Sequence, residues 1–105
     1  KNNETLCVKV SGNYRVDLAE AVRDAAISGW GVAYLASYLL TNEFSEGKLI
    51  QLLPDWKASQ KMPIYAAYPS RKHLPRKITA VIGFLREHIG VQPYWDKALM
   101  KWVSF

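Results

Sequence analysis

Two stretches of the chain repeat their hydrophobic residues with the period of an α-helix. In the first, Asp17 precedes the apolar stripe and Glu20 follows three residues later, which is the spacing of a capping box. This stripe consists of Leu18, Ala21, Val22, Ala25 and Ala26. The second stripe consists of Ile78, Val81, Ile82, Leu85 and Ile89. We therefore predict one helix capped by Asp17 and ended by Gly29, and another that follows Pro75 and ends at Gly90.

Short apolar or alternating runs elsewhere in the chain predict β-strands. These runs cover residues 5–10, 14–16, 32–35, 49–53 and 64–68. A shorter helix is expected over 37–46, and residues 92–105 predict a tail helix with its aromatic side chains on one face. We expect Gly83, inside the second long helix, to allow a close approach to a sheet. The alternation of strands and helices predicts an α/β fold with a largely parallel sheet.

Composition narrows the class of protein. With 105 residues and a mass of 11.9 kDa, the chain has room for one domain, and 50% hydrophobic residues exclude an intrinsically disordered protein. Cys7 is the single cysteine, which excludes a disulfide scaffold, and its apolar neighbours predict a buried side chain. Neither a membrane-spanning run nor a signal peptide is visible, so we expect a cytoplasmic protein without a membrane partner.

Candidate chemistry is sparse. His73 and His88 have no further metal ligand at a suitable spacing, and no serine lies in the context of a nucleophile. The turn at residues 29–31 follows a helix and precedes a strand, which is the wrong order for a phosphate-binding loop. We expect no metal, no cofactor and no enzymatic activity.

Positive charge is concentrated in the second half of the chain. The net charge is +5; residues 1–50 hold five basic and six acidic residues, whereas residues 51–105 hold nine basic and three acidic ones. A cluster of Arg71, Lys72, Arg76 and Lys77 suggests an alternative function as a basic nucleic-acid-binding module. A solvated loop is the commoner use of such a cluster, and no aromatic residue lies within it for base stacking.

The aromatic face of residues 94–102 offers a second alternative, a protein-interaction module. The candidate interaction residues are Tyr94, Trp95 and Trp102. These rings suit a partner-binding surface, and they equally suit a cap on the chain's own core. The sequence alone does not choose between these two roles.

Three segments, in the same order and at the same spacing, resemble the second half of the effector-binding domain of LysR-type transcriptional regulators. They are the runs 16–35, 46–56 and 64–78, the last followed by Ile82-Gly83-Phe84-Leu85. The resemblance covers residues 8–87. The sequence departs from the family pattern at Ala36, where members often have proline, so the crossover between lobes is expected to be freer.

The resemblance implies a periplasmic-binding-protein-like (type 2) fold, in which two α/β lobes enclose a small effector. Residues 1–35 would end the second lobe, residues 36–90 would complete the first lobe, and residues 91–105 would form an aromatic-rich helical tail. Such regulators form oligomers and bind promoter DNA through an N-terminal winged helix-turn-helix, which this chain lacks. We therefore expect partial lobes, self-association and a small-molecule effector as partner.

The candidate effector-binding residues follow from the position of ligands beyond the carboxyl ends of strands in α/β folds. One group is Asp17, Leu18 and Ala19, and the other is Tyr34, Leu35 and Ala36. Backbone N–H groups at the start of the first helix are suited to an effector carboxylate, and Asp17 would compete for them as the cap.

Overall fold

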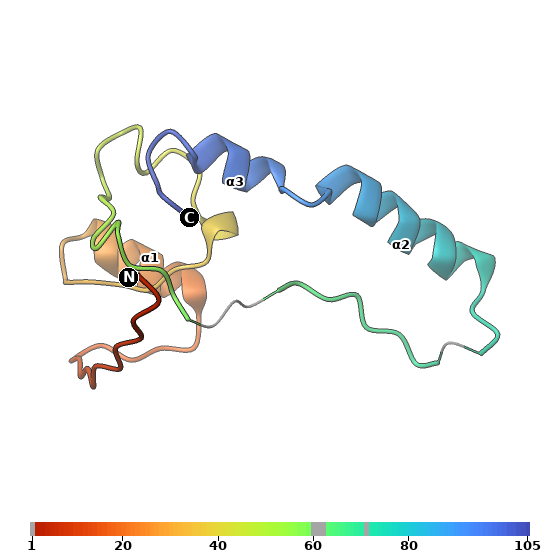
Figure 1. Ribbon diagram of the computed structural model, residues 1–105, viewed down its shortest axis with the longest axis horizontal. Helices are drawn as coiled ribbons and strands as arrows, with labels where there is room; N and C mark the ends of the chain where they lie inside the picture. The colour runs from red at the N-terminus through yellow and green to blue at the C-terminus, as the bar shows by residue number, and fades with distance from the viewer. Residues whose placement is uncertain (1, 60–62, 71) are drawn as a thin grey trace.

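The computed structural model describes residues 2–59, 63–70 and 72–105. It contains α1 (Ala19–Ile27), the 3-10 helix η1 (Ser37–Leu39), α2 (Arg76–Ile89) and α3 (Tyr94–Leu99). Figure 1 shows α1, η1 and α3 gathered at one end of the molecule, with α2 extending away from them. The radius of gyration is 17.4 Å. A compact domain of this length has a radius of about 13 Å, so the chain is expanded.

The first predicted helix is confirmed, including its C-terminal signal. Gly29 has φ +80°, and its N–H donates to the carbonyl of Ala26 at 3.0 Å. The N–H of Trp30 donates to the carbonyl of Ala25 at 3.1 Å. These two bonds form a Schellman motif, which requires a left-handed residue after the helix and is therefore met by glycine.

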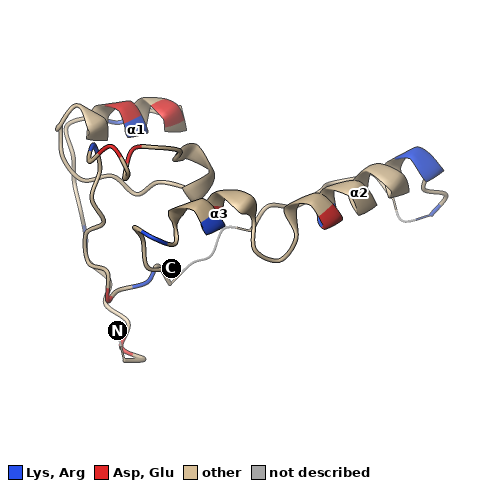
Figure 2. Ribbon diagram, turned by 90° about the horizontal axis from the view of Figure 1, so that it is seen from above, with Lys and Arg blue, Asp and Glu red and all other residues tan. Residues whose placement is uncertain are grey.

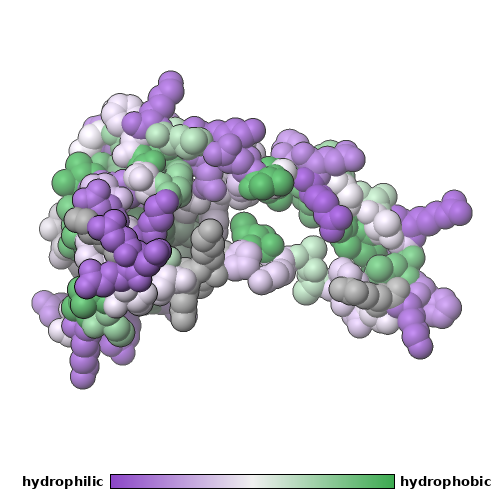
Figure 3. All heavy atoms as spheres, in the orientation of Figure 1, coloured by the Kyte–Doolittle hydropathy of each residue, from purple (hydrophilic) through white to green (hydrophobic). Residues whose placement is uncertain are grey.

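The second predicted helix is also confirmed, as α2, with Pro75 before it and Gly90 (φ +69°) as its C-cap. None of its residues is buried, and Val81, Phe84 and Leu85 are exposed. Figure 3 shows apolar side chains at the surface of this part of the molecule. Val81 and Leu85 of the apolar stripe are therefore open to solvent in this structure, whereas Ile78, Ile82 and Ile89 are half-buried.

The tail begins with a helix shorter than the sequence pattern suggests. α3 ends at Leu99, and the N–H groups of Trp102 and Val103 both donate to the Leu99 carbonyl, at 2.8 and 3.0 Å. The last residues are held by Gln51, whose side-chain amide donates to the carbonyl of Ser104 at 2.9 Å and accepts its N–H at 2.8 Å. The tail is thereby attached to a segment 53 residues earlier in the chain.

The small core lies where α3 packs on η1. The buried hydrophobic residues among those described are Leu39 on η1, 9% exposed, and Leu99 on α3, 2% exposed. η1 also contacts α1. The predicted helix over 37–46 is realised only as η1 and a following turn, in which the N–H of Glu46 donates to the carbonyl of Asn42 at 2.8 Å.

The predicted strands, and with them the α/β sheet, are not observed in the described residues. The segments 5–10, 14–16, 32–35, 49–53 and 64–68 contain no β-ladder, and many of their apolar side chains, such as Val10 and Val32, are exposed. A strand is stable only when a neighbouring strand accepts and donates its backbone hydrogen bonds. Cys7, expected to be buried, is exposed for the same reason, because no sheet packs over its segment among the described residues.

The space around Gly83 shows whether another surface packs closely on α2. A methyl group built at Gly83 meets no atom within 4 Å outside the backbone of its own helix, so the predicted close approach is absent among the described residues. We expect Gly83→Ala to raise the free energy of unfolding by about 1 kcal/mol, because alanine replaces glycine in a helix interior. Chemical denaturation followed by circular dichroism measures the change. A decrease in stability would show that another surface approaches Gly83 in solution.

Candidate functional site

The first group of predicted effector-binding residues lies at the start of α1. Asp17 is exposed, Leu18 is the N-cap with φ −87° and ψ 114°, and Ala19 is the first helical residue. The Leu18 carbonyl accepts the N–H groups of Ala21 and Val22 at 3.1 and 3.3 Å. The prediction that Asp17 caps the helix is wrong, because the helix begins one residue later than the capping box requires. Leu18 makes no side-chain cap hydrogen bond.

The second group lies immediately before η1. Tyr34 is 75% exposed, whereas Leu35 and Ala36 are half-buried. Ala36 is the N-cap of η1, and its carbonyl accepts the N–H of Leu39 at 3.1 Å. The two groups thus lie at the beginnings of two elements, α1 and η1, that contact each other.

Arg23 makes a polar connection between these two elements. Its Nη1 donates to the carbonyl of Leu39 at 3.1 Å. Its Nε and Nη2 both approach Oδ1 of Asp24, each at 3.0 Å. The Arg23 side chain is about a quarter exposed (26%), so the guanidinium lies partly within the contact between α1 and η1.

Glu43, after η1, carries a carboxylate held by its surroundings. Its Oε2 accepts the N–H of Thr41 at 2.6 Å. Partial burial acts to raise the pKa of Glu43, but the backbone N–H groups of Thr41 and of Glu43 itself, together with the positive charge of Arg23, hold this pKa below its usual value. The carboxylate therefore stays ionised at neutral pH.

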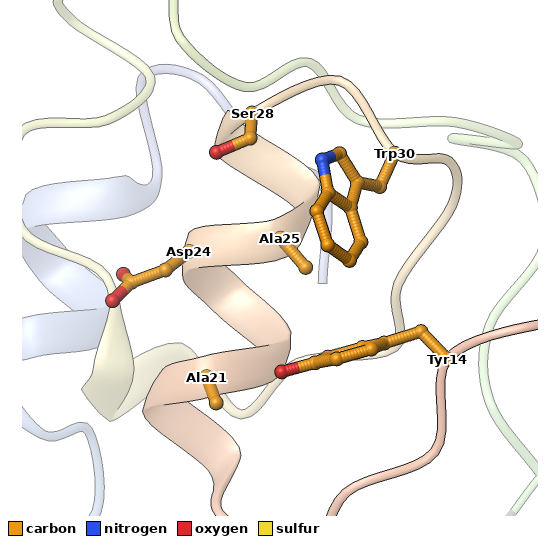
Figure 4. A pocket seen from close by; sticks show the side chains of 6 residues that line it. All are labelled: Tyr14, Ala21, Asp24, Ala25, Ser28 and Trp30. Atoms are coloured by element: carbon orange, nitrogen blue, oxygen red, sulfur yellow. The ribbon is translucent and has the colours of Figure 1, made fainter.

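An open recess lies along α1, next to Tyr14 and Trp30. Its volume is about 250 Å³, and it is lined by Tyr14, Ala21, Asp24, Ala25, Ser28 and Trp30. Figure 4 shows the rings of Tyr14 and Trp30 beside the small side chains of Ala21 and Ala25, with the Asp24 carboxylate on another side of the helix. The two rings meet edge to face, with their centroids 5.2 Å apart and their planes at 82°.

This recess was not among the sites expected from the sequence. A signal was nevertheless present, because the residue after a helix-ending glycine commonly makes an apolar contact with the last turn in a Schellman motif. Trp30 holds that position here, next to Ala25. The contribution of Tyr14 depends on how the preceding loop folds, which no local pattern indicates.

The aromatic residues of the tail form part of a longer aromatic run. The rings of Tyr94 and Trp95 are 5.0 Å apart, and Tyr94 also lies 6.3 Å from His88, which stacks on Phe84 at 5.6 Å. Tyr94 and Trp102 are more than half exposed, whereas Trp95 is half-buried. The buried residue of α3 is Leu99 rather than one of these aromatic residues.

The basic cluster lies around the start of α2, as Figure 2 shows. Lys72, Arg76 and Lys77 are exposed, and Arg71 lies outside the described residues. Cations at a helix N-terminus face the positive end of the helix dipole, so this placement adds no stability to α2. No group of three or more potential metal ligands is found in the described parts of the chain. None of the helices described has the length and apolar character needed to span a membrane.

Comparison with known proteins identifies the class. Residues 2–90 match the LysR substrate binding domain family. The chain is 36% identical over 94 residues to the HTH-type transcriptional regulator PtxR of Pseudomonas aeruginosa, an alignment that covers 90% of this chain. It is 33% identical over 82 residues, 78% of its length, to the HTH-type transcriptional regulator CrgA of Neisseria meningitidis. The chain belongs to the LysR substrate-binding domain family, whose fold is periplasmic-binding-protein-like.

The match covers only part of these relatives. The chain spans 30% of the length of PtxR and 27% of the length of CrgA. No solved structure matches the chain significantly. The family match over residues 2–90 nevertheless confirms, at the level of the family, the resemblance inferred from the three sequence segments.

Proposed function

We propose that this chain is the C-terminal, ligand-sensing and oligomerising portion of a LysR-type transcriptional regulator, and that it has no catalytic activity. The observation that carries the proposal is the family match over residues 2–90 together with 36% identity to PtxR, a transcriptional regulator. A small-molecule effector binds between two lobes, next to residues 17–19 and 34–36. The promoter is bound by an N-terminal winged helix-turn-helix outside this chain, and the regulator acts in the cytoplasm.

The arrangement of α1 and η1 supports this location for the effector. Both groups of residues lie at the starts of contacting elements, and Tyr34 presents an exposed ring. The first turn of α1 has backbone N–H groups directed away from the helix body, and its N-cap Leu18 supplies no side-chain acceptor for them. An anionic group on the effector would be stabilised there.

The mechanism follows from linkage. An effector that binds one arrangement of the lobes more tightly shifts the population toward that arrangement, by no more than its difference in affinity. The α/β sheets of the two lobes, and the division at residue 35, are part of this proposal. The extended segments 5–10 and 32–35 would then be strands whose neighbours come from other parts of the regulator.

Thermal-shift screening tests the site. We expect a compound from a panel of small carboxylates and neutral metabolites to raise the melting temperature. At a concentration of about 100 times its Kd, a ligand stabilises the folded state by about 2.7 kcal/mol. Tyr34→Ala should abolish most of the rise and Asp17→Ala should change its size, whereas Tyr94→Ala, another exposed tyrosine, should leave it intact. A rise that survives both substitutions in full would contradict the assigned site.

A further inference from the structure

Arg23 connects the two structural elements that carry the proposed effector-binding residues. Its guanidinium donates through Nη1 to the Leu39 carbonyl at 3.1 Å, and through Nε and Nη2 it faces Asp24 Oδ1 at 3.0 Å. The residues joined by the first bond are 16 positions apart, so the bond is tertiary. One planar group thus contacts η1 and its own helix at the same time.

The endpoints of this connection lie close in sequence to the two halves of the site. Arg23 lies on α1, one turn beyond residues 17–19. Leu39 ends η1, which is capped by Ala36 and preceded by Tyr34 and Leu35. Leu39 is 9% exposed, so the carbonyl that Arg23 contacts belongs to one of the most buried residues described. A hydrogen bond from a charged donor is stronger than one between neutral groups, so this bond is suited to holding η1 against α1.

We propose that Arg23 is a positioning residue that sets the spacing between the two groups of effector-binding residues, 17–19 and 34–36. The inference rests on the proposed function for the meaning of that spacing. The connection through Arg23 itself is a property of the fold and can be measured without any effector.

The chemistry of the guanidinium is suited to this role. Its donors point in several fixed directions within one plane, so one donor can bond the Leu39 carbonyl while two others face Asp24. A lysine ammonium keeps the charge but has a single nitrogen, which cannot hold both partners in this geometry. The positive charge also acts on Glu43, whose pKa it lowers. Substitutions at Arg23 can therefore separate the effect of its positive charge from the effect of its planar set of donors.

The experiment uses the 105-residue chain with Arg23→Gln, Arg23→Lys and the control Arg86→Gln. Arg86 is an exposed arginine on α2, the helix that extends away from α1 and η1 in Figure 1. Nitroxide labels are attached in a Cys7→Ala background at Asp17→Cys and Tyr34→Cys, and electron paramagnetic resonance gives the distribution of distances between the labels. Amide hydrogen exchange is followed at Leu39 and Leu40, and the Glu43 carboxyl group is titrated by carbon NMR.

For Arg23→Gln we expect a broader label distribution and exchange at Leu39 and Leu40 that is about tenfold faster or more, as for loss of one charge-assisted hydrogen bond. The pKa of Glu43 should rise, because the positive charge that lowers it is gone. Arg23→Lys should restore the low pKa of Glu43 but not the narrow distribution. Arg86→Gln should change none of these quantities.

Two results would overturn the proposal. One is a label distribution for Arg23→Gln as narrow as that for Arg86→Gln. The other is complete restoration of the narrow distribution by Arg23→Lys, which would show that charge alone sets the spacing. Arg23→Lys keeps the charge and so provides a folded comparison should Arg23→Gln unfold. Failure of every compound in the thermal-shift screen would bear on the effector site and leave these measurements unaffected.

Discussion

Leu99→Ala is expected to lower the free energy of unfolding by about 2–3 kcal/mol, at the lower end of the range for buried leucine truncations. Leu99 is 2% exposed and is the most buried hydrophobic residue described. It lies on α3, the helix that packs on η1. Removing its side chain leaves a cavity at this contact and takes away the apolar burial that holds the tail against the rest of the chain.

Denaturant titration followed by tryptophan fluorescence measures this loss. Val91→Ala is the matched control, since Val91 precedes the same helix and is fully exposed (106%), and its truncation should change stability by less than about 0.5 kcal/mol. Equal stability of Leu99→Ala and Val91→Ala would mean that α3 does not pack on η1 in solution.

Gly29→Val is expected to destabilise the chain by about 2 kcal/mol. Gly29 has φ +80°, and the left-handed region costs roughly 1–2 kcal/mol for a residue with a side chain, with β-branched residues the least tolerated. The substitution should also break the bond from the Trp30 N–H to the Ala25 carbonyl and so displace the indole from Tyr14. Loss of near-ultraviolet circular dichroism would report the displaced ring.

Gly12→Val provides the comparison for this effect. A side-chain carbon added at Gly12 would meet no atom within 4 Å, and Gly12 is not among the residues with positive φ. Substitution there should leave both the stability and the near-ultraviolet signal close to those of the original chain. If Gly29→Val behaved like Gly12→Val, the Schellman motif would not be formed in solution.

The two helix-ending glycines show which structural features a local sequence pattern can predict. Gly29 and Gly90 are visible as helix terminators in the sequence, and both have positive φ in the structure, because a helix end depends on a few neighbouring residues. The Asp17 cap is also a local prediction, yet the helix begins after Leu18. A capping box indicates where a helix can start, and the observed start differs from it by one residue, within the one or two residues by which helix ends vary.

The candidate site, too, could be predicted only in part from the sequence. Residues 17–19 and 34–36 follow from the family resemblance and from the strand-to-helix order, and the structure locates them at the starts of α1 and η1. The bond between Arg23 and the Leu39 carbonyl could not be foreseen, since its partners are 16 residues apart and share no pattern. The recess beside Tyr14 and Trp30 likewise depends on how two loops lie against α1.

The sequence by itself determined the two long helices, their glycine ends and membership of the LysR substrate-binding domain family, because each depends on short-range periodicity or on ordered motifs. Only the tertiary structure decided that Leu39 and Leu99 form the buried contact and that the apolar runs 5–10 and 32–35 remain unpaired within the described residues. The physical reason is that helices complete their hydrogen bonds within one segment, whereas strands and cores depend on partners distant in sequence.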